Sequence, residues 1–120
     1  MGGAAQGIGG ALFEEFRYDG SGQPLAATFI DYLEPTAAEV PRVETLICED
    51  APSPDNPLGV KGAGEGGTVG CGAAVTSAIE DALGMPGAIT ALPASPDRIR
   101  ALVRRMSEAD SPAGSSQVRA

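Results

Sequence analysis

The sequence contains no histidine and no tryptophan, and only two of its 120 residues are cysteine. Without histidine, the chain cannot supply the base of a Ser-His-Asp or Cys-His nucleophile, or a histidine ligand to zinc. Cys48 and Cys71 are too few for a cysteine-only metal site, so we interpret each as a small buried apolar residue. We therefore expect this chain to contribute no metal ligand.

Positive charge is also scarce, since eight Lys and Arg residues oppose sixteen Asp and Glu residues, for a net charge of −8. Nucleic acids and anionic membranes are bound through clustered basic residues, so we expect neither as a partner. The one basic cluster, between Arg98 and Arg105, falls on an expected helix and indicates a solvent-exposed face or a subunit contact. No signal-peptide pattern follows Met1, and we expect a soluble cytoplasmic protein.

Aromatic residues make up only 4% of the chain, whereas glycine occurs 17 times and proline 10 times. This composition predicts a loop-rich chain of at most one domain with an aliphatic core. Helical spacing of apolar residues predicts helices near residues 8–16, 68–83 and 96–106, and Gly84 is expected to end the second of these. Residues 1–109 are expected to carry the fold, and residues 110–120 to be a disordered tail.

The remaining periodic segments predict strands, so the expected fold class is α+β, with short mixed or antiparallel strands and three to four helices. Alternation over residues 27–33 predicts a strand that pairs with residues 16–19 as a hairpin. Residues 43–48 are rich in strand-forming types. Thr36 and Glu39 have the spacing of a capping box, which predicts a short helical turn.

The stretch Asn-Pro-Leu-Gly-Val-Lys-Gly-Ala-Gly-Glu-Gly-Gly-Thr, residues 56–68, surrounds Glu65 with glycines. Glycine allows positive φ and close approach of the backbone to a bulky ligand, and the expected helix directly afterwards favours an anion. The simplest functional interpretation is one carboxylate held against a large anionic cofactor. The alternative is a solvent-exposed acid in a flexible turn, alone or paired with Lys61.

Two further patterns are weaker. Residues 62–67 satisfy G-x-G-x-x-G, but prolines rather than a strand precede them, which disfavours a dinucleotide-binding fold. Gln6 lies among glycines in Gln-Gly-Ile-Gly, where its amide could donate to an oxyanion or a pterin edge. An ordinary N-terminal region of a helix explains the same residues.

Three segments in order resemble one family: Gly2–Gly9 (GGAAQGIG), Phe29–Ala37 (FIDYLEPTA) and Pro52–Thr68 (PSPDNPLGVKGAGEGGT). The chain resembles the molybdenum hydroxylases, which include xanthine dehydrogenase, aldehyde oxidase and the large chain of aerobic carbon monoxide dehydrogenase. The resemblance runs from Gly2 to about Val103 and covers only the C-terminal end of the large, molybdopterin-binding subunit. It therefore implies an incomplete domain, from a split or truncated subunit or a piece that complements another chain.

The resemblance implies a molybdenum ion held by molybdopterin, in bacteria often as the cytosine dinucleotide, with iron–sulfur clusters and FAD on partner subunits or domains. The matching glutamate, Glu65, would be the catalytic base that deprotonates Mo–OH during hydroxylation of an aldehyde or N-heterocycle, or in a reaction like that of carbon monoxide dehydrogenase. The expected partners are the remainder of the large subunit, the iron–sulfur and FAD subunits, and a small-molecule substrate. The residues expected to contact the cofactor are Gln6, Gly7, Gly9, Lys61, Gly62, Gly64, Gly66 and Gly67.

Two rival hypotheses stay open at this point. The chain could be a non-catalytic remnant or assembly module that docks on a partner chain. It could also be a free-standing phosphate- or nucleotide-binding module that uses the loop of residues 62–67. Because the residues that shape the substrate site in the family lie largely upstream of the matched part, the sequence does not specify a substrate.

Overall fold

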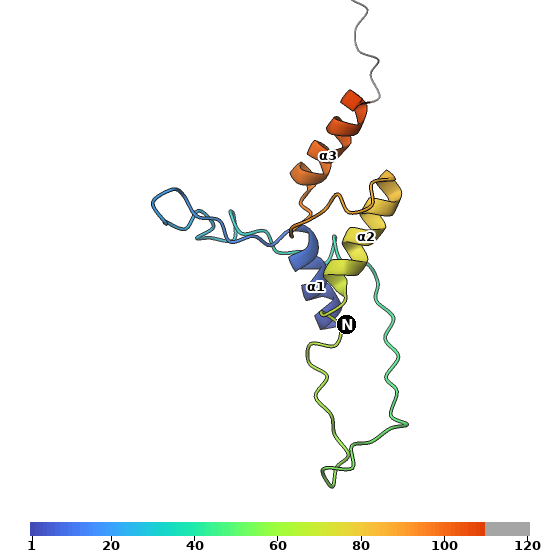
Figure 1. Cartoon of the computed structure of the whole chain (residues 1–120). Coiled ribbons are helices and arrows are strands. Elements are labelled where there is room, and N and C mark those ends of the chain that lie inside the picture. The colour runs from blue at the N-terminus through green and yellow to red at the C-terminus, as the bar shows by residue number, and fades with distance from the viewer. Residues whose placement is uncertain (110–120) are drawn as a thin grey trace, which may run out of the picture.

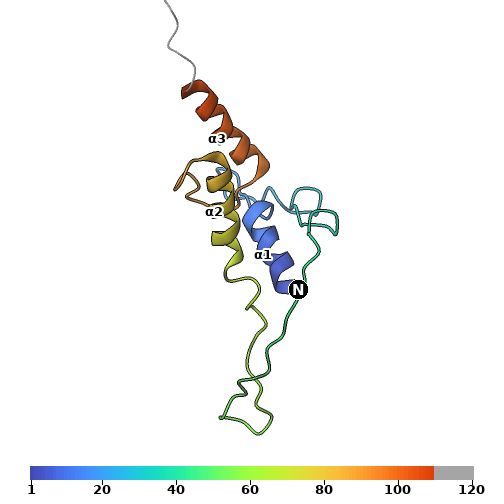
Figure 2. The same cartoon turned by 90° about the vertical axis from the view of Figure 1, so that its right-hand side faces the viewer.

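The computed structural model describes residues 1–109, which form three helices. These are α1 (Gly2–Leu12), α2 (Cys71–Leu83) and α3 (Pro96–Ala109). Helices α1 and α2 lie side by side at the centre, and α3 leads away from them (Figure 1). The same arrangement is visible after a quarter turn (Figure 2). In both views the segment between α1 and α2 extends far from this centre, whereas the connection from α2 to α3 stays close to the helices. The expected tail, residues 110–120, lies outside the described residues.

The ends of the helices follow from local chemistry. Helix α1 ends where the amides of Phe13 and Glu14 both donate to the carbonyl of Gly9, at 2.8 and 2.9 Å. Gly84 ends α2 in the left-handed conformation, with φ 64°, which glycine adopts without a steric penalty. Helix α3 begins at Pro96, where the missing amide hydrogen of proline costs no hydrogen bond. The expected end of α2 and beginning of α3 are thereby confirmed.

The core is very small. Its buried apolar residues are Ala11, Ala26, Ala94 and Leu102. The amide of Ala94 donates to the carbonyl of Ala11 at 2.6 Å, which joins the segment before α3 to the end of α1. Arg98 reinforces this junction by pairing with the carboxylate of Glu15. Because so little apolar surface is covered, hydrophobic burial within these residues contributes little stability.

No extended strand forms within residues 1–109; the structure has one isolated antiparallel bridge, between Tyr18 and Pro24. The amide of Leu25 donates to the carbonyl of Arg17 at 2.7 Å, so residues 16–19 pair with residues 23–25 and not with residues 27–33. Residues 43–48 have no strand partner there either. A strand needs a neighbour for its hydrogen bonds, and none is supplied here. The α+β class stays a prediction for the complete domain.

The predicted turn at Thr36 is confirmed. The Thr36 amide and hydroxyl both donate to one Glu39 carboxylate oxygen, at 2.7 and 2.5 Å. These bonds lower the pKa of Glu39, the hydroxyl contributing most.

The segments between the helices leave apolar residues uncovered. We call residues 13–33 the aromatic arm and residues 42–67 the long loop. Cys48 lies on the long loop and is exposed, so the expectation that it is buried was wrong, while Cys71 is partly buried at the start of α2. Within residues 1–109, no helix is both long and apolar enough to cross a membrane.

Candidate functional site

Glu65 lies in the turn that leads from the long loop into α2. Its carbonyl accepts hydrogen bonds from the amides of Thr68 and Val69, at 2.9 and 3.3 Å, so its backbone is held in place. Its side chain is exposed, and nothing in residues 1–109 covers the carboxylate. The alternative ion pair with Lys61 does not form among these residues, whose one ion pair joins Arg98 and Glu15. Both charged groups are therefore available to another molecule.

The loop before Glu65 has an open backbone. Among the described residues, the amides of residues 61–65 donate to no protein acceptor. A Cβ atom added at Gly62 or Gly64 would meet nothing within 4 Å, and one added at Gly66 would make only an ordinary contact, 3.6 Å from the carbonyl of Ala63. None of these three glycines has positive φ. Neither the packing nor the backbone conformation of residues 1–109 therefore requires glycine here.

The loop is fixed at its N-terminal side by a second turn. The Asn56 side chain donates to the carbonyl of Val60 at 3.0 Å and accepts from the amide of Val60 at 3.1 Å. Gly59 lies inside this turn with φ 66°. Its added Cβ would lie 2.8 Å from the Cβ of Pro52, so both its conformation and its space require glycine. We call this turn, residues 52–60, the asparagine clasp.

At the C-terminal side, the loop is fixed against α1. The Thr68 hydroxyl donates to the carbonyl of Gly3 at 2.8 Å. A Cβ atom added at Gly67 would lie 3.0 Å from the amide nitrogen of Ala4. The chain thus passes so close to the first turn of α1 that a larger residue would force the two segments apart.

Residues Gln6–Gly9, where cofactor contacts are expected, form the middle of α1, and Gly7 and Gly9 are buried. A Cβ atom at Gly7 would lie 2.5 Å from the Cβ of Cys71, and one at Gly9 would collide with the Glu14 side chain and approach Pro35 at 3.0 Å. Both glycines therefore have a packing role within the chain. Gln6 is exposed, and its side chain is available to a ligand.

A groove lies beside α1, and of the predicted site residues only Gln6 and Gly7 line it. It has a volume of about 340 Å³ and brings Gln6 and Gly7 of α1 beside Thr68 and Val69, which follow the Glu65 turn. Gly10 and Gly72 also line it, and neither was predicted as a site residue. Their signal in the sequence is the high content of small residues on both helices, which permits a close contact but does not show where it forms.

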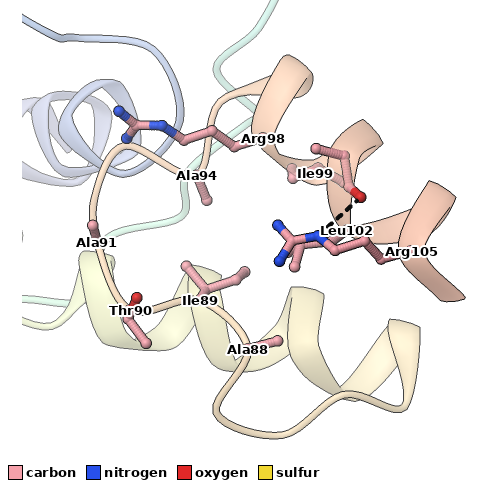
Figure 3. A pocket seen from close by; sticks show the side chains of 10 residues that line it. Ala88, Ile89, Thr90, Ala91, Ala94, Arg98, Ile99, Leu102 and Arg105 are labelled. Atoms are coloured by element: carbon pink, nitrogen blue, oxygen red, sulfur yellow. Dashed lines mark hydrogen bonds between the residues drawn. The ribbon is translucent and has the colours of Figure 1, made fainter.

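A second hollow, of about 190 Å³, lies between α3 and residues 88–91. None of the predicted site residues lines it, and its apolar side chains include Ile89 and Leu102. Two arginines border it, Arg98 and Arg105; the guanidinium group of Arg105 lies beside Leu102, and that of Arg98 lies further away, at the upper left (Figure 3). Arg98 also donates to the carbonyl of Pro93 at 2.8 Å, so its charge is engaged within the chain.

The N-terminal third of the chain, residues 1–41, matches the family model described as the molybdopterin cofactor-binding domain. Among curated proteins, the gamma subunit of the 6-hydroxypseudooxynicotine dehydrogenase complex of Paenarthrobacter nicotinovorans is 47% identical over 110 residues, which are 92% of this chain and 14% of that subunit. The carbon monoxide dehydrogenase large chain of Afipia carboxidovorans is 41% identical over 68% of this chain and 10% of its own length. The chain therefore spans only a small part of the relatives it matches.

This chain also superimposes on a small part of longer chains among the solved structures. Quinoline 2-oxidoreductase from Pseudomonas putida 86 superimposes on 86% of this chain with a TM-score of 0.70 and 39% identity, and the match covers 13% of that protein's chain. A copper- and molybdenum-containing carbon monoxide dehydrogenase in its carbon monoxide reduced state superimposes on 88% of this chain with a TM-score of 0.72 and 33% identity. That match also covers 13% of the longer chain.

Proposed function

This chain belongs to the molybdenum hydroxylase family, and we propose that it forms the part of a molybdopterin-binding large subunit that supplies Glu65 as the catalytic base. The observation that carries the proposal is the open glycine loop of residues 61–66. Contacts within residues 1–109 do not require glycine at positions 62, 64 and 66, and Lys61 and Glu65 form no ion pair there. A loop built in this way suits close contact with a bulky anionic group.

The residues present fit molybdopterin through three kinds of group. The unpaired amides of residues 61–65 and the Lys61 ammonium group would hold the phosphate of the cofactor. Gln6, at the groove beside Thr68, would offer its amide to the pterin. Gly62, Gly64 and Gly66 would let the backbone approach the cofactor, and Gly67 would hold the loop against α1. Gly7 and Gly9 would act indirectly, by setting the position of α1 relative to this loop.

The bound cofactor would supply a molybdenum centre that accepts electrons from the substrate. Glu65 would take up a proton on a carboxylate oxygen as the nucleophile attacks. Its backbone is fixed by the amides of Thr68 and Val69, so the carboxylate leaves the chain from a defined position. Cofactor and surrounding protein would exclude water from a side chain that residues 1–109 leave exposed, and a carboxylate in a dry site is a stronger base.

For the substrate, we favour an N-heteroaromatic compound, since two of the relatives are named for such compounds. Nicotine 6-hydroxylase of Paenarthrobacter nicotinovorans is 41% identical over 82% of this chain, and quinoline 2-oxidoreductase is 39% identical. We also propose the cytosine dinucleotide form of the cofactor, iron–sulfur and FAD subunits as partners, and a cytoplasmic location. The relative named as a gamma subunit supports assembly into a complex of several subunits.

A covalent chimera tests the base directly. In the gamma subunit of the 6-hydroxypseudooxynicotine dehydrogenase complex, this chain would replace the 110-residue stretch that aligns with it. We expect Glu65→Gln in this chimera to lower kcat by about 10²- to 10⁴-fold, because proton transfer by a positioned base contributes on that scale. Molybdenum content, measured by mass spectrometry, should stay unchanged.

The matched control is Glu44→Gln, which removes another exposed carboxylate from the long loop and should leave kcat unchanged. Full turnover of the Glu65→Gln chimera would refute the base role. Parallel loss of turnover and molybdenum would show that Glu65 serves cofactor binding instead.

A further inference from the structure

The aromatic arm carries a set of exposed apolar side chains, which we call the aromatic patch. Its members are Phe16, Tyr18, Leu25, Phe29, Ile30 and Leu33, exposed by 53 to 88%. Six large apolar residues within 18 positions of an acidic chain are more than the scattered exposure normal for a soluble surface. Beside them lies a hollow of about 390 Å³, lined mainly by Phe16, Ala26, Phe29 and Tyr32.

Local hydrogen bonds support the shape of the patch, although no other part of residues 1–109 covers it. The Asp19 carboxylate accepts from the amides of Ser21 and Gln23, at 2.8 and 3.0 Å, and these bonds close the hairpin at its tip. At the base of the arm, the Tyr32 hydroxyl donates to the Glu14 carboxylate at 2.9 Å and joins the two ends of the arm. The ring of Phe16 lies between these two fixed points, 6.2 Å from the ring of Tyr32. An apolar surface held in one shape loses little freedom when it binds.

The similarity to solved proteins indicates what covers this surface. The chain has the same conformation, over 86 and 88% of its length, as a part of two proteins that are several times longer. The family model of the molybdopterin-binding domain also spans the whole patch, since it matches residues 1–41. The patch residues therefore belong to a part of the chain that resembles much longer molybdopterin-binding proteins.

We propose that the aromatic patch is the surface on which this chain docks to the remainder of a molybdopterin-binding large subunit, with an apolar side chain of that partner in the hollow beside Phe29. The inference rests on the proposed function for the identity of the partner. It adds the surface on which the two parts of the large subunit contact each other.

Binding in trans tests the docking surface. The probe is the gamma subunit of the 6-hydroxypseudooxynicotine dehydrogenase complex without the 110-residue stretch that aligns with this chain, mixed with the full chain and followed by sedimentation velocity. We expect saturable one-to-one binding by the wild-type chain. Phe29→Asp and Ile30→Asp should each weaken it at least tenfold, because a carboxylate would be buried among apolar groups.

Phe29→Leu, which keeps the apolar character, should retain binding within threefold. Val103→Asp is the matched control, since it places the same charge on an exposed apolar residue of α3. Circular dichroism establishes whether each variant keeps its helices. Three results would overturn the inference: no binding by the wild-type chain, unchanged binding by both aspartate variants, or self-association of the wild type that the aspartate variants abolish. None of these affects the covalent chimera, so failure of the docking surface and failure of the Glu65 proposal can be told apart.

Discussion

The contact between Gly7 and Cys71 determines how closely α1 and α2 approach. Its effect on stability can be measured by comparing a substitution at Gly7 with the same substitution at Gly10. A Cβ atom at position 7 would lie 2.5 and 2.6 Å from the Cβ and Sγ atoms of Cys71. Gly10, in the same helix, has nothing within 4 Å of its added Cβ. Gly7→Ala and Gly10→Ala therefore make the same chemical change in α1 and differ only in what the new methyl group meets.

The expected magnitudes follow from two opposing terms. Replacing glycine by alanine inside a helix stabilises it by about 1 kcal/mol. Overpacking at a close contact costs about 1–3 kcal/mol. Gly10→Ala should thus stabilise the chain by about 1 kcal/mol, whereas Gly7→Ala should be neutral or destabilising by up to about 2 kcal/mol. The two variants should differ by about 1–3 kcal/mol.

Circular dichroism at 222 nm during a urea titration measures this difference. Gly10→Ala should have the higher helix content and the higher urea midpoint. Adding Cys71→Gly to Gly7→Ala removes both colliding atoms and should recover part of the loss, because the two positions are coupled. Equal curves for Gly7→Ala and Gly10→Ala would refute the helix contact, since without it the two substitutions are equivalent.

Two further predictions concern the ends of α2 and of the loop. The amides of Ile89 and Gly87 lower the pKa of Glu80 below its ordinary 4.5, and the Ile89 bond of 2.7 Å contributes most. These hydrogen bonds therefore stabilise the fold fully above pH 4.5, and their contribution is lost as the pH falls through the lowered pKa. The Ile89 amide resonance in NMR should therefore shift with a midpoint below pH 4.5 and stop titrating in Glu80→Gln; a midpoint above 4.5 would contradict the sign. Asn56→Ala removes both bonds of the asparagine clasp, each worth about 1 kcal/mol, and should speed tryptic cleavage after Lys61 several-fold, whereas Asn56→Asp keeps the acceptor and should have the smaller effect. Unchanged cleavage in Asn56→Ala would show that the clasp does not order the loop.

The helix ends could be predicted from the sequence because their causes are local. Gly84 ends α2 through its own backbone freedom, and Thr36 and Glu39 form their turn within four residues. The helix around Gln6 was harder to place. Glycines are poor helix formers, and Gly7 is required in α1 by its contact with Cys71, more than sixty positions away. A single sequence gives no sign of that contact.

The expected strands do not form within residues 1–109, for a related reason. The alternation of residues 27–33 is typical of a half-buried strand, but a strand also needs a partner, and residues 1–109 do not supply one. The candidate site was predicted unevenly. The sequence indicated the importance of Glu65 and its glycines, and the structure shows both as exposed, but the cover that would make a site of them lies outside these residues.

The loop around Glu65 is held at both ends and free between them. The asparagine clasp ends at Val60, and the next fixed segment begins at Glu65, whose carbonyl accepts from the amides of Thr68 and Val69. Only the four residues from Lys61 to Gly64 therefore have backbone freedom to lose on binding a ligand, at about 1–2 kcal/mol for each residue that becomes ordered. Side chains that do not contact the ligand, such as Asn56 and Thr68, therefore contribute to affinity at this loop. Each of them shortens the stretch of backbone that loses conformational entropy on binding.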